Sequence, residues 1–255
     1  MSPTKYARRM AATKTVSTGQ TPRRRKISCQ PIFVFEGEWD GQGSMAARRA
    51  GAYVDALAPC LSEMSETASH QVVVFRRDVH TARGLRLCLG MAADKCREEG
   101  WERPILYFAC HGKEDALYLS HDEQDGRVVK ESLAIWIHEC GFTLPLVAFG
   151  ACLVGGTDGG AGAQDDRFAD LLVRTGGALA VAAYAKEIPW LHSTLADLLV
   201  LHGFSRLHAL RAVQANSFSI DWPPEARELA RRLGLKVWRR KVGPGPTVHC
   251  AEFDL

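Results

Sequence analysis

One histidine and one cysteine, His111 and Cys152, each follow an apolar run closely along the chain. The apolar runs cover residues 105–110 and 144–149, and glycine lies beside each of the two side chains. Short apolar runs that end in a turn predict buried β-strands. If these strands are parallel neighbours, an imidazole and a thiol meet at the carboxyl rim of a sheet, where open α/β proteins build their sites.

Nucleophilic catalysis is the chemistry that such a pair suits. A thiol near pH 7 is mostly protonated, and an adjacent imidazole can take its proton or stabilise the thiolate. We therefore expect His111 to be the base and Cys152 the nucleophile. The backbone amides of Gly112 and Cys152 are candidates for stabilising an oxyanion, because Gly112 lacks a Cβ and lets substrate approach its N–H closely. Ordinary packing of a single histidine and a single cysteine is the alternative.

Strands and helices alternate along the part of the chain that carries this pair. Such alternation predicts an α/β fold with parallel strands joined by crossover helices. Residues 116–120 predict a further short strand and residues 121–126 a turn. The main strands are expected over 32–35, 71–75, 104–109, 144–149 and 178–184, and the helices over 44–61, 81–100, 132–141, 168–174, 189–202 and 205–214.

The two ends of the chain differ from this middle part. Residues 1–30 carry eight Lys and Arg and no acidic residue, although the net charge of the whole chain is only +3. This segment has no apolar core of its own, so we expect a flexible basic tail, and a nucleic-acid contact is considered only there. Residues 216–255 are expected to form an extension, with a helix from the Pro223-Pro224 pair and a hairpin of residues 235–239 and 247–253.

Composition narrows the class of protein. With 255 residues, 46% hydrophobic and 24% charged, the chain resembles an ordinary globular protein. It contains no apolar stretch of the roughly 18 residues that a membrane span needs, and no secretory signal is recognised. The eight cysteines form no CxxC pair, which indicates a reducing cytoplasm and no zinc site. We expect no metal, no cofactor and no membrane partner.

Two short motifs and the sequence after them resemble CHAT domains, which are caspase-like domains found with TPR repeats. Phe108-Ala109-Cys110-His111-Gly112 is similar to the histidine motif of that family, and Gly150-Ala151-Cys152-Leu153-Val154-Gly155 to its cysteine motif. Residues 168–181 resemble the helix and strand that follow the cysteine, and residues 203–214 resemble the closing helix. The resemblance covers about residues 103–215.

This resemblance implies a caspase-like, three-layer α/β/α sandwich over residues 31–215, with a mostly parallel central sheet. It also implies a cysteine endopeptidase with His111 and Cys152 as its dyad, a protein or peptide substrate, a regulatory protein partner, and a role in defence or cell death. The chain departs from the family in two ways, because Leu153 stands where an acidic residue usually follows the cysteine, and because the TPR array is absent. Caspases themselves have Gln where this chain has Gly150, so an aspartate-selecting caspase pocket is not supported.

Two other functions stay open at this point. An α/β-hydrolase-like enzyme with a cysteine nucleophile needs a G-x-C-x-G elbow and a downstream histidine, and His192, His202 and His208 follow the cysteine. A non-catalytic caspase-like module for assembly is the other alternative.

Acidic residues at the predicted rim suggest a preference for a basic side chain in the substrate. The first strand is followed by Glu36, Glu38 and Asp40, and Asp158 lies in the glycine-rich stretch after Cys152. One carboxylate in a pocket would select Arg or Lys. The run of basic residues 23–26 is then a candidate for self-cleavage, and the loop over 154–167 is expected to become ordered when substrate binds.

Overall fold

The computed structural model describes residues 28–38, 59–61, 70–113, 115–155, 165–209, 224–240 and 248–251. Most of the predicted helix 44–61 lies outside these residues, and the part that is described, 59–61, is helical. The tail up to residue 27, with its proposed cleavage site, also lies outside them, as do residues 156–164 of the loop that was expected to become ordered.

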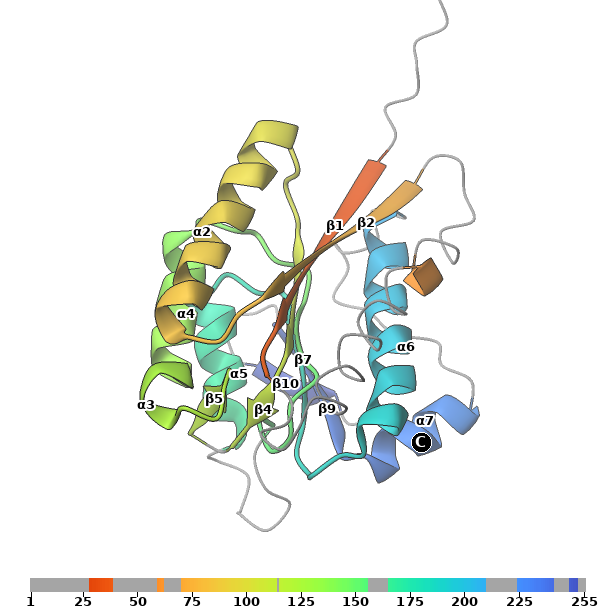
Figure 1. Ribbon diagram of the computed structural model, residues 1–255. Coiled ribbons are helices and arrows are strands. Elements are labelled where there is room, and N and C mark those ends of the chain that lie inside the picture. The colour runs from red at the N-terminus through yellow and green to blue at the C-terminus, as the bar shows by residue number, and fades with distance from the viewer. Residues whose placement is uncertain are drawn as a thin grey trace, which may run out of the picture.

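A seven-stranded sheet forms the centre of the molecule (Figure 1). Its strand order is β10-β9-β8-β7-β3-β1-β2, in which β2, β1, β3, β7 and β8 run parallel. Strand β9 pairs antiparallel with both β8 and β10. The strands are Ser28–Glu36 (β1), His70–Asp78 (β2), Ile105–Ala109 (β3), Val147–Phe149 (β7), Ala180–Tyr184 (β8), Leu235–Arg240 (β9) and Val248–Ala251 (β10).

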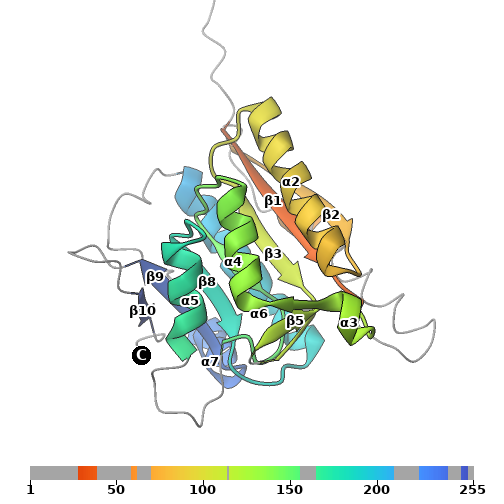
Figure 2. The same ribbon diagram turned by 90° about the vertical axis from the view of Figure 1, so that its left-hand side faces the viewer.

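Helices cover both faces of this sheet, and a small antiparallel sheet lies beyond the end of β3 (Figures 1 and 2). One face carries α2, α4 and α5, and the other carries α6 and α7. The predicted α/β/α sandwich with a mostly parallel central sheet is therefore confirmed. The helices are Ala82–Glu99 (α2), Glu123–Gly126 (α3), Lys130–Glu139 (α4), Asp165–Arg174 (α5), Trp190–Ala209 (α6) and Pro224–Arg232 (α7), and the small sheet is His111–Gly112 (β4), Ala116–Tyr118 (β5) and Arg127–Val129 (β6).

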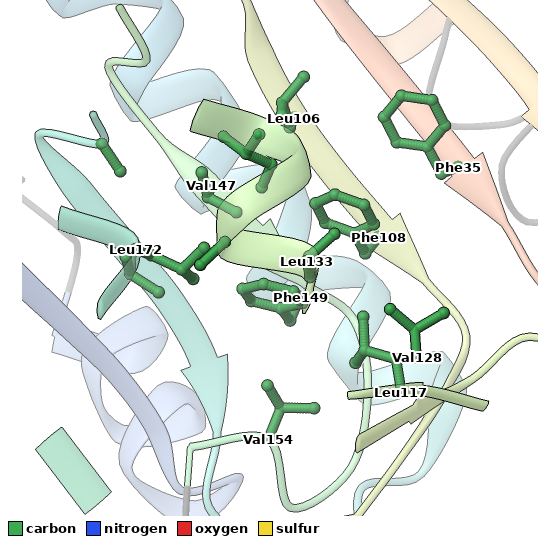
Figure 3. Packing of buried hydrophobic residues seen from close by; sticks show 14 of the residues in the cluster. Phe35, Leu106, Phe108, Leu117, Val128, Leu133, Val147, Phe149, Val154 and Leu172 are labelled. Atoms are coloured by element: carbon green, nitrogen blue, oxygen red, sulfur yellow. The ribbon is translucent and has the colours of Figure 1, made fainter. Parts of the chain in front are cut away.

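Alternate residues of each central strand enter two separate apolar cores, as the pleat of a strand requires. On the side of α2, α4 and α5, Phe35, Phe108 and Phe149 stack across three strands, with ring centroids 5.2–5.3 Å apart (Figure 3). On the side of α6 and α7, the core includes Tyr107 and Tyr184. Because β3 is buried on both faces, its near-continuous apolar sequence is what a central parallel strand needs.

Local signals explain where several elements begin and end. Thr81 caps α2 by accepting a hydrogen bond from the N–H of Gly84, and Gly100 ends that helix in a left-handed conformation with φ 68°. Strand β1 begins at Ser28, earlier than the predicted residue 32, and so includes Pro31. That proline is tolerated because β3 pairs only with Ile32–Glu36, which leaves β1 with β2 as its one neighbour at residue 31.

Two predicted elements differ from those observed, and a third has an additional neighbour. Gly203 was expected to separate two helices, but α6 runs through it without a break to Ala209, because one glycine costs a helix only about 1 kcal/mol. Residues 121–126 were predicted as a turn but include the short helix α3, whose N-cap is Asp122. The predicted hairpin near the C-terminus is present, and β9 also pairs with β8, so these strands extend the central sheet.

Candidate active site

The two strands that precede His111 and Cys152 are parallel neighbours. Strands β3 and β7 pair with Phe108 opposite Phe149, and the N–H of Gly150 donates to the carbonyl of Phe108 over 2.9 Å. The chain therefore leaves both strands at the same end of the sheet. His111 follows the last paired residue of β3 by three positions, and Cys152 follows that of β7 by three.

Gly112 lies directly against the turn that carries Cys152. A Cβ built on Gly112 would lie 2.4 Å from the carbonyl oxygen of Cys152 and 2.5 Å from Cγ2 of Val154. Both distances are too short for any real side chain, so only glycine permits this approach of the two backbones. The side chain of Val154 is itself fixed in the apolar core, near Leu117 and Phe149 (Figure 3).

His111 is held by the small sheet that follows β3. It pairs with Tyr118 across β4 and β5, and its side chain is half-buried. The imidazole of His121 lies near it, with ring centroids 6.1 Å apart. Lys113, further along the hairpin, donates its N–H to the carbonyl of Ala116 over 3.0 Å. Because hydrogen-bonded and non-hydrogen-bonded pairs alternate in an antiparallel ladder, the N–H of Gly112 points away from β5.

The sulfur of Cys152 accepts a hydrogen bond from the backbone N–H of Ile188, with 3.4 Å between nitrogen and sulfur. Ile188 lies in the segment after β8, the strand that neighbours β7 on the side away from β3. In the same segment, the carbonyl of Lys186 accepts a hydrogen bond from the N–H of Leu153 over 3.3 Å. The Cys152 residue is half-buried, and its sulfur has a defined neighbour.

Backbone geometry around Cys152 is specific to a sharp turn. Leu153 has φ 57°, in the left-handed region that a residue with a Cβ adopts at a cost of about 1–2 kcal/mol. Residues 151–155 form a bend and a turn rather than the beginning of a helix. An α/β-hydrolase elbow leads from strand to helix, so the chain after Cys152 does not have that form.

A buried lysine binds the end of the turn that carries Cys152. Lys130, at the beginning of α4, is only 7% exposed, and its Nζ donates to the carbonyl of Val154 over 3.0 Å. The same Nζ lies 5.0 Å from the ring centroid of Phe168 on α5, a cation–π contact. Sequence reasoning missed this role, because a lone lysine at the start of a helix is ordinarily solvated.

The acidic residues expected to bind substrate are only partly described. Strand β1 does neighbour β3, with Glu36 opposite Ala109, so its carboxyl end lies at the same rim as His111. Glu36 is buried and forms an ion pair with Arg76 of β2, 2.6 Å between Oε2 and Nε. Glu38 is half-buried and donates its backbone N–H to the carbonyl of Leu119 over 2.7 Å. The other two expected residues, Asp40 and Asp158, lie outside the described residues.

Burial separates five of the other cysteines from a catalytic role. Complete burial raises the pKa of the Cys110 thiol to about 12, and burial raises that of Cys96 to about 11. Burial also raises the pKa of Cys29, Cys88 and Cys140. A thiol whose pKa is raised contributes little thiolate near neutral pH, so these side chains act as small hydrophobic groups. In the described residues no cluster of three or more His, Cys, Asp and Glu side chains is arranged to hold a metal ion.

Comparison with known proteins gives structural likenesses alone. No family model matches the sequence, and no curated protein matches it. A secreted C11 cysteine protease from Bacteroides thetaiotaomicron is similar in structure, with a TM-score of 0.46, 12% identity, and 64% of this chain and 54% of the protease covered. The same kind of protease, in complex with an irreversible peptide inhibitor, gives a TM-score of 0.48, 10% identity, and 83% and 66% coverage.

The Drosophila initiator caspase Dronc has a TM-score of 0.38 and 10% identity, with 86% of this chain and 88% of the caspase covered. This chain spans between about half and two thirds of the bacterial proteases. At such low identity the likenesses concern the arrangement of strands and helices, and they identify no catalytic residue. None of the described helices is long and apolar enough to cross a membrane.

Proposed function

We propose that this protein is a cysteine endopeptidase of the caspase-like type, in which His111 and Cys152 form the catalytic dyad. The observation that carries the proposal is the contact between Gly112 and the carbonyl of Cys152, which brings the residue next to the histidine against the cysteine itself. The resemblance of both motifs to CHAT domains supports the same assignment. It also supports the assignment as a regulated protease, which cleaves a protein or peptide and is controlled by a regulatory protein partner.

In the proposed reaction, His111 takes the proton of the Cys152 thiol, and the sulfur attacks the carbonyl carbon of the scissile peptide bond. The resulting oxyanion is stabilised by the backbone N–H groups of Gly112 and Cys152. The C–N bond then breaks, the amine leaves with the proton from His111, and a thioester remains on Cys152. Water, deprotonated by His111, attacks the thioester, releases the carboxylic acid and restores the thiol.

The N–H of Gly112 is suited to this role because it points away from β5 and does not take part in the ladder of the small sheet. The N–H of Ile188 supports the sulfur in a similar way, since a donor within 3.4 Å stabilises the negative charge of a thiolate. Together these groups provide donors both for the attacking atom and for the oxygen that becomes charged.

The test is cleavage of a peptide library by the wild type and by two variants, Cys152→Ala and His111→Ala. Each variant should lose cleavage while keeping the circular dichroism spectrum of the wild type, because both side chains are half-buried at a rim. Cys60→Ala and His138→Ala are matched controls, since both side chains are exposed, and His138 lies in the last turn of α4. Near wild-type turnover by His111→Ala would show that the dyad assignment is wrong.

We further propose that the substrate pocket prefers Arg or Lys, through Glu38, Asp40 and Asp158. Glu36 is a weaker candidate than the sequence indicated, because its carboxylate already forms an ion pair with Arg76. Glu38→Gln should lower kcat/KM for substrates with Arg before the scissile bond and leave substrates with Ala there unaffected. Products that end in Asp or in small apolar residues would contradict the basic pocket and leave the dyad intact.

A cytoplasmic location is proposed as well. Seven of the eight cysteines, Cys152 among them, are free thiols in the described residues, and the resting enzyme would need Cys152 in its reduced form. Inactivation of the purified protein by mild oxidants, and recovery with a thiol reductant, is the expected behaviour.

A further inference from the structure

A buried aspartate on α6 joins two buried tyrosines from two strands of the central sheet. Asp197 is 4% exposed, and its Oδ2 accepts a hydrogen bond from the hydroxyl of Tyr107 over 2.7 Å. The other oxygen, Oδ1, lies 2.8 Å from the hydroxyl of Tyr184. Both tyrosines are completely buried. Each carboxylate oxygen thus has a phenol of its own, one at β3 and one at β8, on the two sides of β7.

The Tyr107 end of this cluster touches the chain just before Cys152. A Cβ built on Gly150 would lie 2.2 Å from the hydroxyl oxygen of Tyr107 and 3.1 Å from Oδ2 of Asp197. The hydroxyl therefore occupies the space that any side chain at residue 150 would need. Only glycine at position 150, two residues before Cys152, leaves room for the Tyr107 hydroxyl and its partner Asp197.

The Tyr184 end touches the chain just after Cys152. The carbonyl of Tyr184 accepts the N–H of Gly155 over 2.8 Å, and a Cβ on Gly155 would lie 3.1 Å from that carbonyl oxygen. The Tyr184 hydroxyl is also 3.2 Å from the carbonyl oxygen of Ser193, in the first turns of α6. Thus Tyr184 contacts the end of the cysteine turn through its backbone carbonyl and the beginning of α6 through its hydroxyl.

The beginning of α6 is connected to the Cys152 sulfur through Pro189 and Ile188. The N–H groups of His192 and Ser193 both donate to the carbonyl of Pro189, over 3.0 and 3.1 Å. Pro189 directly follows Ile188, whose N–H donates to the Cys152 sulfur. A shift of α6 relative to the sheet would therefore move the donor away from the sulfur.

We propose that Tyr107, Asp197 and Tyr184 are positioning residues that hold the turn of residues 150–155 at both ends and fix the Cys152 sulfur against the N–H of Ile188. The inference rests on the proposed function, in which Cys152 is the nucleophile. Hydrogen bonds suit this purpose better than apolar packing, because they define both distance and direction. A carboxylate in a core is costly to desolvate, and the two phenols compensate for that cost at two defined points.

The test compares Tyr107→Phe, Tyr184→Phe and Asp197→Asn with the wild type. The matched control is Gln30→Met, which also removes buried hydrogen bonds, to the carbonyls of Pro31 and Arg103, but at the opposite end of the sheet. The first measurement is the rate at which iodoacetamide alkylates Cys152 between pH 6 and pH 9, followed by mass spectrometry of the Cys152 peptide. The second is kcat and KM on a cleaved peptide.

Each tyrosine variant should slow alkylation at pH 7 by about tenfold and lower kcat by a similar factor with KM little changed, since small displacements of a reacting atom have large effects on rate. Gln30→Met should leave both quantities unchanged while lowering thermal stability to a similar extent. If the three variants lose only stability and keep the wild-type alkylation rate, the positioning role is wrong. Asp197→Asn keeps the shape of the side chain, so a folding failure of one tyrosine variant does not end the test.

Failure of the proposed function gives a different result. If the wild type cuts no peptide but its Cys152 is alkylated faster than in the tyrosine variants, the positioning of the sulfur holds and the peptidase assignment does not. If the wild type cuts peptides and the variants cut equally fast, the peptidase assignment holds and the positioning does not.

Discussion

Ile188 donates its backbone N–H to the sulfur of Cys152 over 3.4 Å, although the two residues are 36 positions apart in the chain. The donor comes from the segment after β8, while Gly112 contacts the same cysteine from the segment after β3. The cysteine turn after β7 is thus held from both neighbouring strands. A thiolate at this position has a fixed amide beside it, which is a condition for reactivity that the histidine alone does not provide.

Ile188→Pro should reduce the reactivity of Cys152, because proline has no N–H to donate to the sulfur. A hydrogen bond to a charged group contributes about 1.5–3 kcal/mol, so alkylation of Cys152 at pH 7 should slow by roughly 10- to 100-fold. Ile188→Ala is the control, since it shortens the side chain and keeps the N–H. Equal rates in the two variants would mean that the N–H does not support the sulfur.

Gly112→Ala should displace the cysteine turn. The new Cβ would lie 2.4 Å from the carbonyl oxygen of Cys152, and backbone atoms would have to move to accept it. We expect a loss of about 1–3 kcal/mol in the free energy of unfolding, together with loss of peptide cleavage. Urea denaturation and a cleavage assay measure the two effects.

Gly90→Ala is the matched control for that substitution. Gly90 lies within α2, where an added Cβ meets nothing within 4 Å. Alanine in a helix interior should stabilise the protein by about 0.5–1 kcal/mol and leave cleavage unchanged. Wild-type activity in Gly112→Ala would remove the main support for the proposed dyad.

Much of this arrangement could be predicted from the sequence, because it depends on strand ends. Apolar runs bounded by glycine predicted the strands before His111 and Cys152, and alternation with helices predicted that they are parallel. That β3 and β7 are neighbours was only a condition at that point, and the pairing of Phe108 with Phe149 meets it. The strand predicted over 144–149 is longer than the observed β7, which covers Val147–Phe149. The observed strand is shorter because Pro145 lacks the N–H that a longer ladder would use.

Other features carry no sequence signal. The donor at Ile188 is a backbone group, and every residue but proline has one. Asp197 lies in the middle of a helix whose sequence does not show that this position faces two tyrosines of the sheet. Glu36 was expected at the rim, and its pairing with Arg76 became visible only with the register of β1 and β2. These three depend on tertiary contacts between distant segments.

Arg76→Ala should destabilise the fold, because it removes the guanidinium beside the Glu36 carboxylate, whose side chain is 4% exposed. Breaking a buried pair costs about 3–5 kcal/mol, and since Arg76 is itself 30% exposed we expect about 2–3 kcal/mol. Arg86→Ala is the control, because its pair with Glu139 is exposed and should contribute less than about 1 kcal/mol. Adding Glu36→Gln to Arg76→Ala should restore part of the loss, and no recovery would show that the cost is not one of charge.

Cys110 should make the protein less stable at alkaline pH. Burial raises the pKa of its thiol from the ordinary 9.0 to about 12 in the folded state, so the folded protein keeps a proton that the unfolded chain releases. The stabilisation from this group is fully present below about pH 9 and is lost as pH rises toward 12, with a slope of at most about 1.4 kcal/mol per pH unit. Cys110→Ala has no thiol to ionise, so the difference in unfolding free energy between wild type and variant should shrink steadily over that range.

Urea denaturation of both proteins at pH 8, 9, 10 and 11 measures this difference. A constant difference across those pH values would mean that the Cys110 thiol is not held in its neutral form by the fold.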